Sequence, residues 1–576
     1  MSATMTPPAA GVKVRAYRHG FGDCFLLAFP TADPDVAWYL MIDCGLFWQY
    51  KRSDGAGIRE QLAAVAADLR DATGGDIDAL VITHEHYDHL GGFHHEESLR
   101  ILHDEIHFRE LWLPWTEDPG DDLAEELREE ADLELRLLRR ELLAVARRMG
   151  VRSLGVEDAE AGEQPEALAG LSFADELLGF SRSTSDALAA VREMFEARTD
   201  EAGDEVVPRR PTRYFDPGDL HLPMGPDGPR IWVLGPPRSR QALRSNERSG
   251  EHFESGADHP LRALDQAPAE RRLAALHTAL EGREDAGRSD AARAFERGVG
   301  LELGELGEEA APSPELEFFR RHYGLGADDG NDGSDGGMVD GGGGAAAGGP
   351  GEVDDQDVEV ADDAAWRRID RVWLGELDEL ALQYDNYVNN TSMVLAIAPG
   401  DSDKVLLFVG DAQAGNWLSW CDEVVRCDDG AGGSVSSHEL LQRAVLYKVG
   451  HHGSHNATLR KGVELMTSPE LVAVIPTDEE WAWHKRSSGD GGWRMPFLPI
   501  YRALLERCRG RVLQTDSGLP TDKPRMTPRD SDGKEPFSDE EFAESETLIA
   551  QHAGEIAELA ARLRSEELFF ELTIDP

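Results

Sequence analysis

The chain has 576 residues, of which 58 are lysine or arginine and 110 are aspartate or glutamate, so its formal charge at pH 7 is -52. A negative field of this size keeps a protein soluble and repels nucleic acid and other polyanions at long range. No run approaches the roughly 18 apolar residues that a membrane-spanning helix needs. The composition therefore disfavours a long nucleic acid as partner. It also predicts no membrane-spanning helix.

The cysteines are few and odd in number, which argues against a disulfide framework. Residues 1–11 lack the basic start and the apolar stretch of a secretion signal. We therefore expect buried free thiols and a cytoplasmic protein. The five cysteines are Cys24, Cys44, Cys421, Cys427 and Cys508.

Residues 12–116 have the pattern of a globular fold. Short apolar runs bounded by turn residues predict strands, and apolar positions at helical spacing predict a helix over 58–69. The last of these strands runs directly into a cluster of histidines. The strands are expected at 12–17, 25–29, 38–42 and 77–83.

The middle of the chain changes in composition twice. Residues 117–216 are acidic with leucines at helical spacing, which predicts an amphipathic helical insertion. Strand signals return within 217–237, at 230–234. Residues 238–364 form a low-complexity insertion, and its part 327–363 is so rich in Asp, Gly and Ala that we expect disorder.

Strand-sized apolar runs return in residues 365–520, which we take as the second half of the fold that begins at residue 12. A tail follows at 521–576, with a helix expected near 546–563 and a strand at 568–574. The strands of the second half are expected at 371–374, 393–398, 405–409, 444–449, 471–475 and 511–514.

The segment His84-Glu85-His86-Tyr87-Asp88-His89 carries the clearest chemical signal. On an extended backbone His84 and His86 project to the same side, so their imidazoles converge on one metal ion. Asp88 and His89 follow in the turn and reach a second ion. Imidazole and carboxylate ligands suit zinc, iron or manganese better than calcium.

This segment resembles the signature of the metallo-β-lactamase superfamily, and three later or earlier motifs fall in the family's order. They are Ile42-Asp43-Cys44-Gly45, Gly410-Asp411-Ala412 and the run from Lys448 to Ser454, which reads Lys-Val-Gly-His-His-Gly-Ser. The last is similar to the soluble hydrolase domain of the ComEC-type DNA-uptake proteins and its stand-alone relatives. Gly22-Asp23-Cys24 and the Asn-Asn-Thr-Ser run that contains Asn390 are further shared features.

The resemblance implies a set of roles. His84 and His86 would hold the first metal ion, and Asp88, His89 and one histidine of the late motif the second. We favour His452 as that ligand and expect His451 beside it, facing the substrate. Asp411 would bridge the two ions, and Asp43 would buttress the ligand loop from behind.

The chain departs from the family at the first metal ion, to which the family supplies a third histidine from a strand in the first half. The matching region, 111–115, contains no histidine. A water or a carboxylate such as Glu117 would complete the site. The nearby histidines, which we expect to be surface or core residues, are His94, His95, His103, His107 and His221.

The fold implied is α/β, an αββα sandwich of two mixed sheets with helices outside and metals at one edge. Two ions about 3.5–4 Å apart would share a bridging hydroxide as nucleophile, oriented by Asp88. The candidates for contact with the substrate's oxygens are His451, Ser454 and Asn390.

The motif favours hydrolysis of a phosphodiester or another phosphoester, and the charge favours a small or nucleotide substrate. The alternatives are a thioester, lactone or lactam hydrolase on the same fold, which fold alone does not separate. A further alternative is a non-catalytic interaction protein that uses the helical insertion for docking. The metals expected are two divalent ions, zinc before manganese or iron.

Overall fold

The computed structural model describes residues 4–47, 50–52, 55–148, 184–199, 205–245, 384, 386–484, 493–521 and 539–576. The chain divides into two units, of which the first is Met1–Asp265 with Gly375–Pro576. Every described residue belongs to the first unit. The predictions for the low-complexity insertion beyond residue 245, including its disorder, and for the strand 371–374 therefore lie outside the described residues.

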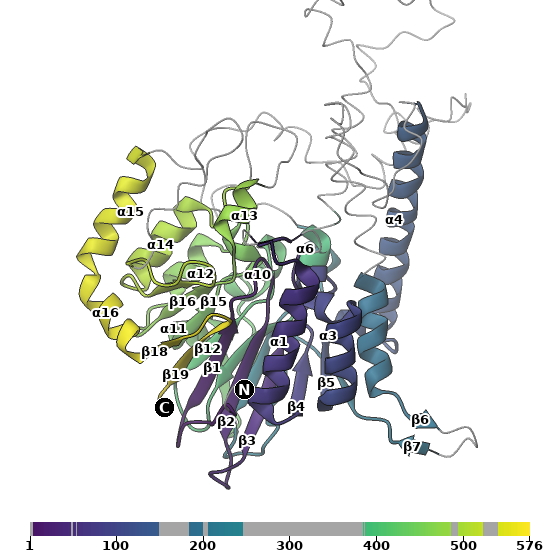
Figure 1. The fold of residues 1–576 in the computed structure, drawn as a ribbon, viewed down its shortest axis with the longest axis horizontal. Helices are drawn as coiled ribbons and strands as arrows, with labels where there is room; N and C mark the ends of the chain where they lie inside the picture. The colour runs from purple at the N-terminus through teal and green to yellow at the C-terminus, as the bar shows by residue number, and fades with distance from the viewer. Residues whose placement is uncertain are drawn as a thin grey trace, which may run out of the picture. The chain divides into compact units, whose positions relative to one another are not determined.

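The first sheet has 8 strands in the order β18-β19-β1-β2-β3-β4-β5-β8 (Figure 1). Its pairing is antiparallel from β18 to β3 and parallel from β3 to β8. The strands are β1 (Val12–Tyr17), β2 (Phe25–Pro30), β3 (Ala37–Ile42), β4 (Asp76–Val81), β5 (His107–Pro114), β8 (Thr212–Phe215), β18 (Leu563–Ser565) and β19 (Phe569–Ile574).

The second sheet has 7 strands in the order β17-β16-β15-β12-β11-β10-β9. Here β9 to β12 pair antiparallel, and β12, β15, β16 and β17 pair parallel. The strands are β9 (Leu220–His221), β10 (Arg230–Gly235), β11 (Val394–Ala398), β12 (Val405–Phe408), β15 (Ala444–Lys448), β16 (Val472–Ile475) and β17 (Val512–Gln514). Two small hairpins are β6 (Arg198–Thr199) with β7 (Glu205–Val207) and β13 (Arg426–Asp428) with β14 (Ser434–Ser436).

Alternate residues of each strand enter different cores, because successive side chains point to opposite faces of a sheet. In β2, Phe25 and Leu27 join a core shared with residues of the second sheet, such as Phe408, whereas Leu26 packs with helix residues, such as Leu62. A third core lies between the second sheet and its own helices. Most strand residues that enter these cores are apolar because both faces of each sheet are covered, and exceptions such as Arg15 of β1 and Glu571 of β19 are buried as an ion pair.

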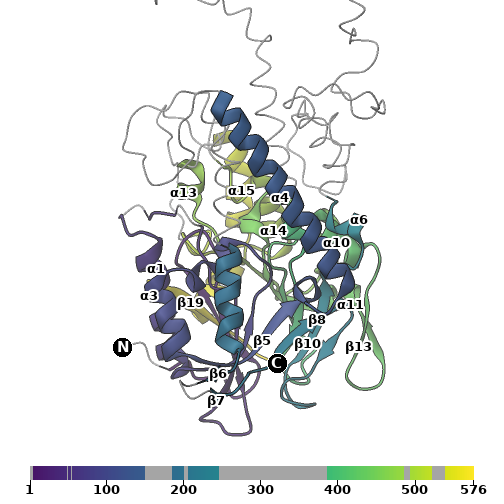
Figure 2. The same ribbon diagram turned by 90° about the vertical axis from the view of Figure 1, so that its right-hand side faces the viewer.

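The helices form the two outer layers. Beside the first sheet lie α1 (Ile58–Thr73) and α3 (Glu96–Arg100), and beside the second lie α10 (Ala414–Cys421), α11 (Ser437–Gln442), α12 (Arg460–Leu465) and α14 (Leu498–Arg507). Figure 2 shows α4 (Asp122–Arg148) as one long helix. Further helices are α2 (Tyr87–Leu90), α6 (Arg240–Leu243), α13 (Glu479–His484), α15 (Asp539–Gln551) and α16 (Ala553–Arg562), with short helical turns η1 (Gly91–Phe93), η2 (Ile101–Glu105), η3 (Trp115–Glu117) and η8 (His451–Gly453). Residues 184–195 are helical as well and pack in the core of the first sheet.

The expected αββα sandwich is confirmed. Two segments differ from their expected place. β8 lies within the range assigned to the helical insertion yet pairs with β5, and β19 lies in the assigned tail yet pairs with β1 along its whole length. The helix expected near 546–563 is two helices, α15 and α16. None of the described helices combines the length and apolarity needed to cross a membrane.

Candidate metal centre

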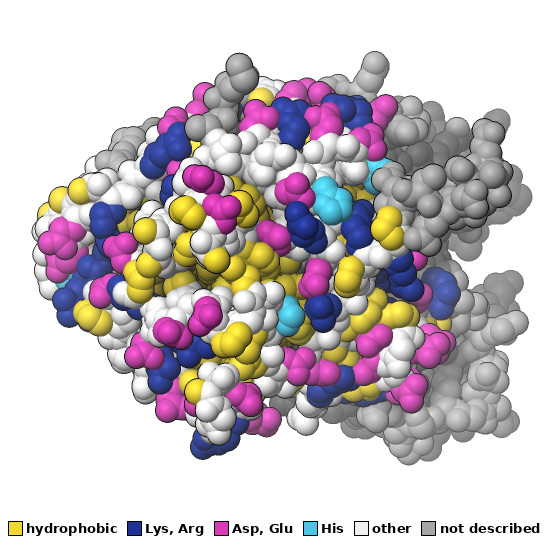
Figure 3. Space-filling model, turned by 90° about the horizontal axis from the view of Figure 1, so that it is seen from below, with side chains coloured by type: hydrophobic (Ala, Val, Ile, Leu, Met, Phe, Trp, Pro, Cys, Tyr) yellow, Lys and Arg dark blue, Asp and Glu magenta, His cyan; other side chains and the backbone are white. Residues whose placement is uncertain are grey.

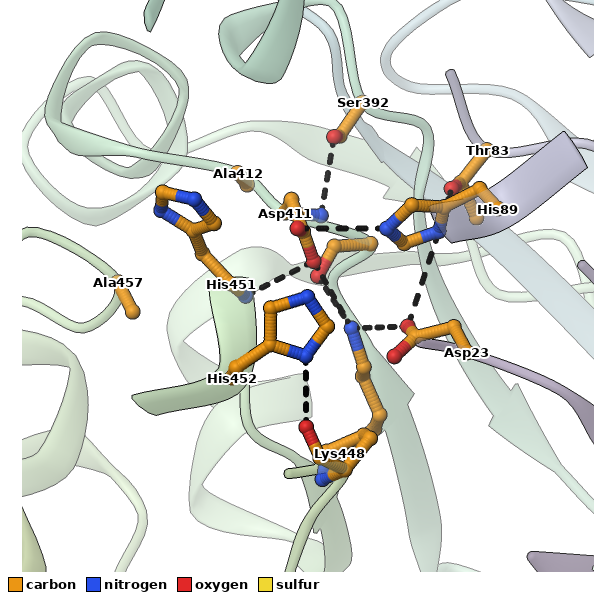
Figure 4. Close-up of polar contacts among 12 residues, drawn as sticks. Asp23, Thr83, His89, Ser392, Asp411, Ala412, Lys448, His451, His452 and Ala457 are labelled. Atoms are coloured by element: carbon orange, nitrogen blue, oxygen red, sulfur yellow. Dashed lines mark hydrogen bonds and ion pairs between the residues drawn. The ribbon is translucent and has the colours of Figure 1, made fainter. Parts of the chain in front are cut away.

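The parallel strands bring the predicted ligands to one edge of the sandwich. Parallel strands present their carboxyl ends at the same edge of a sheet, and the loops after β4, β12 and β15 carry His84, Asp411 and His452. The two sheets are joined here, because the backbone N–H of Met393 donates to the carbonyl of Thr83 at 2.8 Å. Residues far apart in sequence therefore share one site (Figure 4).

Small residues let the loops around α2 approach closely. A Cβ on Gly45 would lie 2.1 Å from the carbonyl carbon of Asp88, and one on Gly92 would lie 2.6 Å from Cys44 Sγ. The Cys44 N–H donates to the carbonyl of His89 at 2.8 Å. Glycine is required at these positions because the backbone of one loop packs directly on the next.

Two groups of side chains have the composition and spacing of metal sites. His84, His89 and Asp411 form one group, and Asp88, Asp411 and His452 the other, each with ligand atoms within 4.8 Å of one another. Asp411 is common to both, which is the arrangement expected of a bridging carboxylate. All of these side chains are buried.

The donor atoms fit divalent metal ions. His84 Nε2, His89 Nε2 and Asp411 Oδ2 are buried and make no well-formed hydrogen bond among the described residues, although His89 Nε2 and Asp411 Oδ2 form an ion pair at 3.3 Å. Buried polar atoms are seldom left unpaired, and these three point into one cluster. Nitrogen and carboxylate donors of this kind suit zinc, manganese or iron.

The Nδ1 atoms of His89 and His452, which face away from the cluster, donate hydrogen bonds to the protein. Asp43 Oδ2 accepts from His89 Nδ1 at 2.8 Å, and the carbonyl of Pro476 accepts from His452 Nδ1 at 2.7 Å. Each bond leaves Nε2 facing the cluster. Such outer contacts fix the tautomer and orientation of a metal-binding histidine.

Asp43 is hydrogen-bonded to the loop that carries the early histidine cluster. Besides His89, it accepts hydrogen bonds from the N–H of Thr83 at 2.8 Å and from Thr83 Oγ1 at 2.7 Å. Its backbone is left-handed, with φ of 55°. Aspartate tolerates this conformation better than most residues, and strained backbone of this kind clusters at functional sites.

The two histidines of the late motif have different places. His452 Nε2 lies 2.8 Å from Asp88 Oδ2, within one of the metal-capable groups. His451 belongs to neither group and is more exposed; its backbone N–H donates to Asp411 Oδ1 at 2.8 Å. Both residues have positive φ, 41° for His451 and 54° for His452.

Burial and charge set the protonation of the cluster. Burial lowers the pKa of His86 to about 4 and that of His84 well below its usual value, so both rings are neutral, as metal ligands must be. Burial alone would raise the pKa of Asp88, but His89 and His452 outweigh it and lower that pKa. The carboxylate is therefore ionised at neutral pH.

The third ligand of the first ion is not supplied by the candidates named from sequence. Among the described residues, Glu117 and the five other histidines considered belong to no metal-capable group. Glu117 instead accepts from Arg192 at 2.7 Å, and His221 packs on Trp112. His86 is buried with its ring centroid 4.7 Å from that of His84, but it too stands outside the groups.

Of the three expected substrate contacts, Asn390 and Ser454 are engaged within the protein. Asn390 is fully buried; its Nδ2 donates to the carbonyls of Leu243 and Ser245, and its Oδ1 accepts from the N–H of Asn416. We therefore correct its role from substrate contact to structural residue. Ser454 Oγ lies 2.9 Å from His451 Nδ1 and 2.8 Å from Asn456 Oδ1, which places it as a support of the His451 ring.

Sequence reasoning assigned no role to Asp23 and Lys448, although both stand in motifs quoted for the resemblance. Lys448 Nζ forms ion pairs with Asp23 and Asp411 inside the site, and Asp23 joins Asp43 and His89 in a third cluster. The signal available was the presence of a lysine and an aspartate in those motifs, but nothing in their spacing pairs them.

Comparison with known proteins supports the class. Residues 37–143 match the profile of the family described as the metallo-beta-lactamase superfamily. This range includes Asp43 and the early histidine cluster and ends before Asp411. The mixed α/β sandwich is consistent with the fold of that superfamily. No curated protein and no solved structure matches the chain.

Proposed function

We propose that the chain is a hydrolase that depends on two divalent metal ions and acts on a phosphodiester or another phosphoester. His84, His86, Asp88, His89, Asp411 and His452 would hold the ions, with zinc expected before manganese or iron. The observation that carries the proposal is the shared position of Asp411 between two buried ligand groups. Bound ions would lower the pKa of water at the site and offset charge that develops on the substrate.

The residues of the chain supply orientation. Asp88 lies 2.8 Å from His452 at the centre of the second group and would direct the attacking water. His451 is placed at the rim, its backbone tied to Asp411 and its Nδ1 contacted by Ser454. Burial lowers the pKa of His451, so its neutral ring would contact the substrate's oxygens or exchange a proton with the leaving group.

The late motif, the net charge and the charged surface support the proposed substrate class. The late motif is similar to the ComEC-type branch, which favours a phosphoester. The net charge of -52 favours a small-molecule or nucleotide ester over a long nucleic acid. On the face shown in Figure 3, basic side chains are interspersed with acidic ones and form no continuous track. The five buried free cysteines support the further proposal of a cytoplasmic location.

The test is a substrate panel on the full chain, freed of metal and then reconstituted with Zn²⁺ or Mn²⁺. We expect turnover of bis-p-nitrophenyl phosphate that requires metal and is lost in Asp411→Ala. The matched control is Asp403→Ala, because the Asp403 side chain is 89% exposed. Turnover of a thioester, lactone or lactam alone would replace the phosphoester assignment, and metal binding without any turnover would favour an interaction protein.

A further inference from the structure

The last residue of β15 buries a positive charge inside the candidate metal centre. Lys448 has a side chain only 1% exposed, and its Nζ donates to the carbonyl of Gly410 at 2.7 Å and to Asp411 Oδ1 at 3.1 Å. Nζ also forms an ion pair with Asp23 Oδ2 (Figure 4). An ammonium group has three protons, so these contacts use all of them.

The two carboxylates that meet Lys448 come from opposite halves of the fold. Asp23 lies in the loop between β1 and β2 of the first sheet, and Asp411 follows β12 of the second. Both are buried, with side chains 2% and 0% exposed. A buried ammonium is held only if it is paired and hydrogen-bonded, so its position is fixed by these acceptors and in turn restrains them.

The contact with Lys448 gives the two carboxylate oxygens of Asp411 different partners. Oδ1 receives Lys448 Nζ at 3.1 Å and the His451 N–H at 2.8 Å. Oδ2 receives no hydrogen bond and lies 3.3 Å from His89 Nε2, inside the metal-capable group. With Oδ1 committed to the protein, the carboxylate cannot rotate away, and Oδ2 is the oxygen left for metal ions.

Lys448 also accounts for the third acidic cluster, which contains Asp23, Asp43 and His89. The His89 Nδ1 proton is already given to Asp43 at 2.8 Å, and Asp23 is already paired with Lys448. The ammonium group of Lys448 therefore supplies the positive charge that balances this cluster.

We propose that Lys448, held by Asp23, is a positioning residue that fixes Asp411 in its metal-bridging orientation. The proposal rests on the metal centre of the proposed function. It assigns to Lys448 no contact with substrate. A purely structural ion pair would contribute to folding alone, whereas a positioning residue also sets the affinity for metal.

The test is the double variant Asp23→Asn/Lys448→Met, which removes one negative and one positive charge and leaves the net charge unchanged. Metal-free protein is titrated with Mn²⁺ by calorimetry, and bound metal is counted after gel filtration. We expect Mn²⁺ affinity to fall about tenfold or more, the size of effect known for residues that orient metal ligands, with the thermal midpoint of the metal-free form near that of the unaltered chain.

The matched control is Arg15→Met/Asp68→Asn, which also removes one buried positive and one buried negative charge, leaves Glu571 paired with Arg564, and should leave Mn²⁺ affinity unchanged. If the double variant fails to fold, Lys448→Met alone is used. In that single variant the loss of a positive charge would by itself strengthen cation binding. For either variant, weaker Mn²⁺ binding supports the positioning role, and equal or stronger binding overturns it. Failure of the unaltered chain to bind metal would instead refute the proposed function.

Discussion

His452 and Asp88 are 364 residues apart in the chain, yet His452 Nε2 lies 2.8 Å from Asp88 Oδ2. The contact joins the loop after β15 of one sheet to the short helix α2 that follows β4 of the other. Local folding alone would not bring these two residues together. The site therefore forms only when both halves of the sandwich are in place, which couples metal binding to the tertiary fold.

This contact separates the roles of the two adjacent histidines. We expect His452→Ala to lower the number of bound metal ions, because it removes a donor from the group with Asp88 and Asp411. His451→Ala should keep both ions and lower kcat by about 10²- to 10⁴-fold, the usual contribution of a residue that transfers a proton. Metal analysis of both purified variants decides the assignment, and the opposite pattern would exchange the roles.

Asp43 should act through His89 rather than on the substrate. Asp43→Asn keeps a side chain that tolerates the left-handed backbone but weakens the acceptor of the His89 Nδ1 proton. We expect metal affinity to fall by about 10- to 100-fold, while KM for any substrate found changes little at saturating metal. Calorimetric titration and kinetics at two metal concentrations measure both. An unchanged metal affinity would leave Asp43 with a structural role only.

The part of the site that is local in sequence was predictable. His84 to His89 follow β4 directly, and the end of that strand, Ala79 to Val81, is apolar because both faces of its sheet are covered there. The strands expected at 12–17 and 38–42 also agree with β1 and β3; β3 is apolar throughout, whereas β1 alternates apolar residues with Lys13 and Arg15. Full burial makes such runs visible without any knowledge of their partners.

The part that depends on distant partners was not predictable. Lys448 reads as an ordinary strand end until the fold places Asp23 beside its ammonium group. Asn390 reads as a polar candidate for substrate until Leu243 and Asn416 are seen to use its amide. Likewise, the local pattern of residues 569–574 indicates a strand but not that the strand pairs with β1 at the other end of the chain.

Asn390 also offers a test of a structural role. The Asn390→Ala variant leaves the Asn416 N–H and two carbonyls without their partner in a fully buried position. We expect the free energy of unfolding to fall by about 1–3 kcal/mol without a change in metal stoichiometry. Urea unfolding and metal analysis measure the two effects. A raised KM with normal stability would return Asn390 to the substrate site.

A second buried network, remote from the metals, ties the C-terminal strand to the first sheet. Arg15 is fully buried and pairs with Asp68 of α1 and Glu571 of β19. Arg15→Met should lower the free energy of unfolding by about 3–5 kcal/mol, because it leaves the buried Asp68 without a cation, while Glu571 keeps Arg564 at 3.1 Å. Adding Asp68→Asn and Glu571→Gln should recover much of this loss. Urea unfolding of both variants tests it, and equal stability of the single and triple variants would contradict the argument.

Acid should weaken the fold through a buried histidine outside the metal-capable groups. Burial lowers the pKa of His19 to about 4, below the value of about 6.5 for an unfolded chain. Between these values the unfolded chain binds more protons, so the free energy of unfolding falls as pH falls from about 6.5 towards 4. The full contribution is present above about pH 6.5 and amounts to at most about 3.5 kcal/mol, at about 1.4 kcal/mol per pKa unit.

His19→Gln removes this titration while keeping a donor for the carbonyl of Gly45, which His19 Nε2 contacts at 2.6 Å. Urea unfolding of metal-free protein at pH 7 and pH 4.5 should therefore show a smaller difference for the variant than for the unaltered chain. His94→Gln is the matched control, because His94 is exposed. Since His86 is depressed to a similar pKa, part of the pH dependence should survive in the variant. An unchanged slope would mean that His19 is already protonated in the fold, against the burial seen.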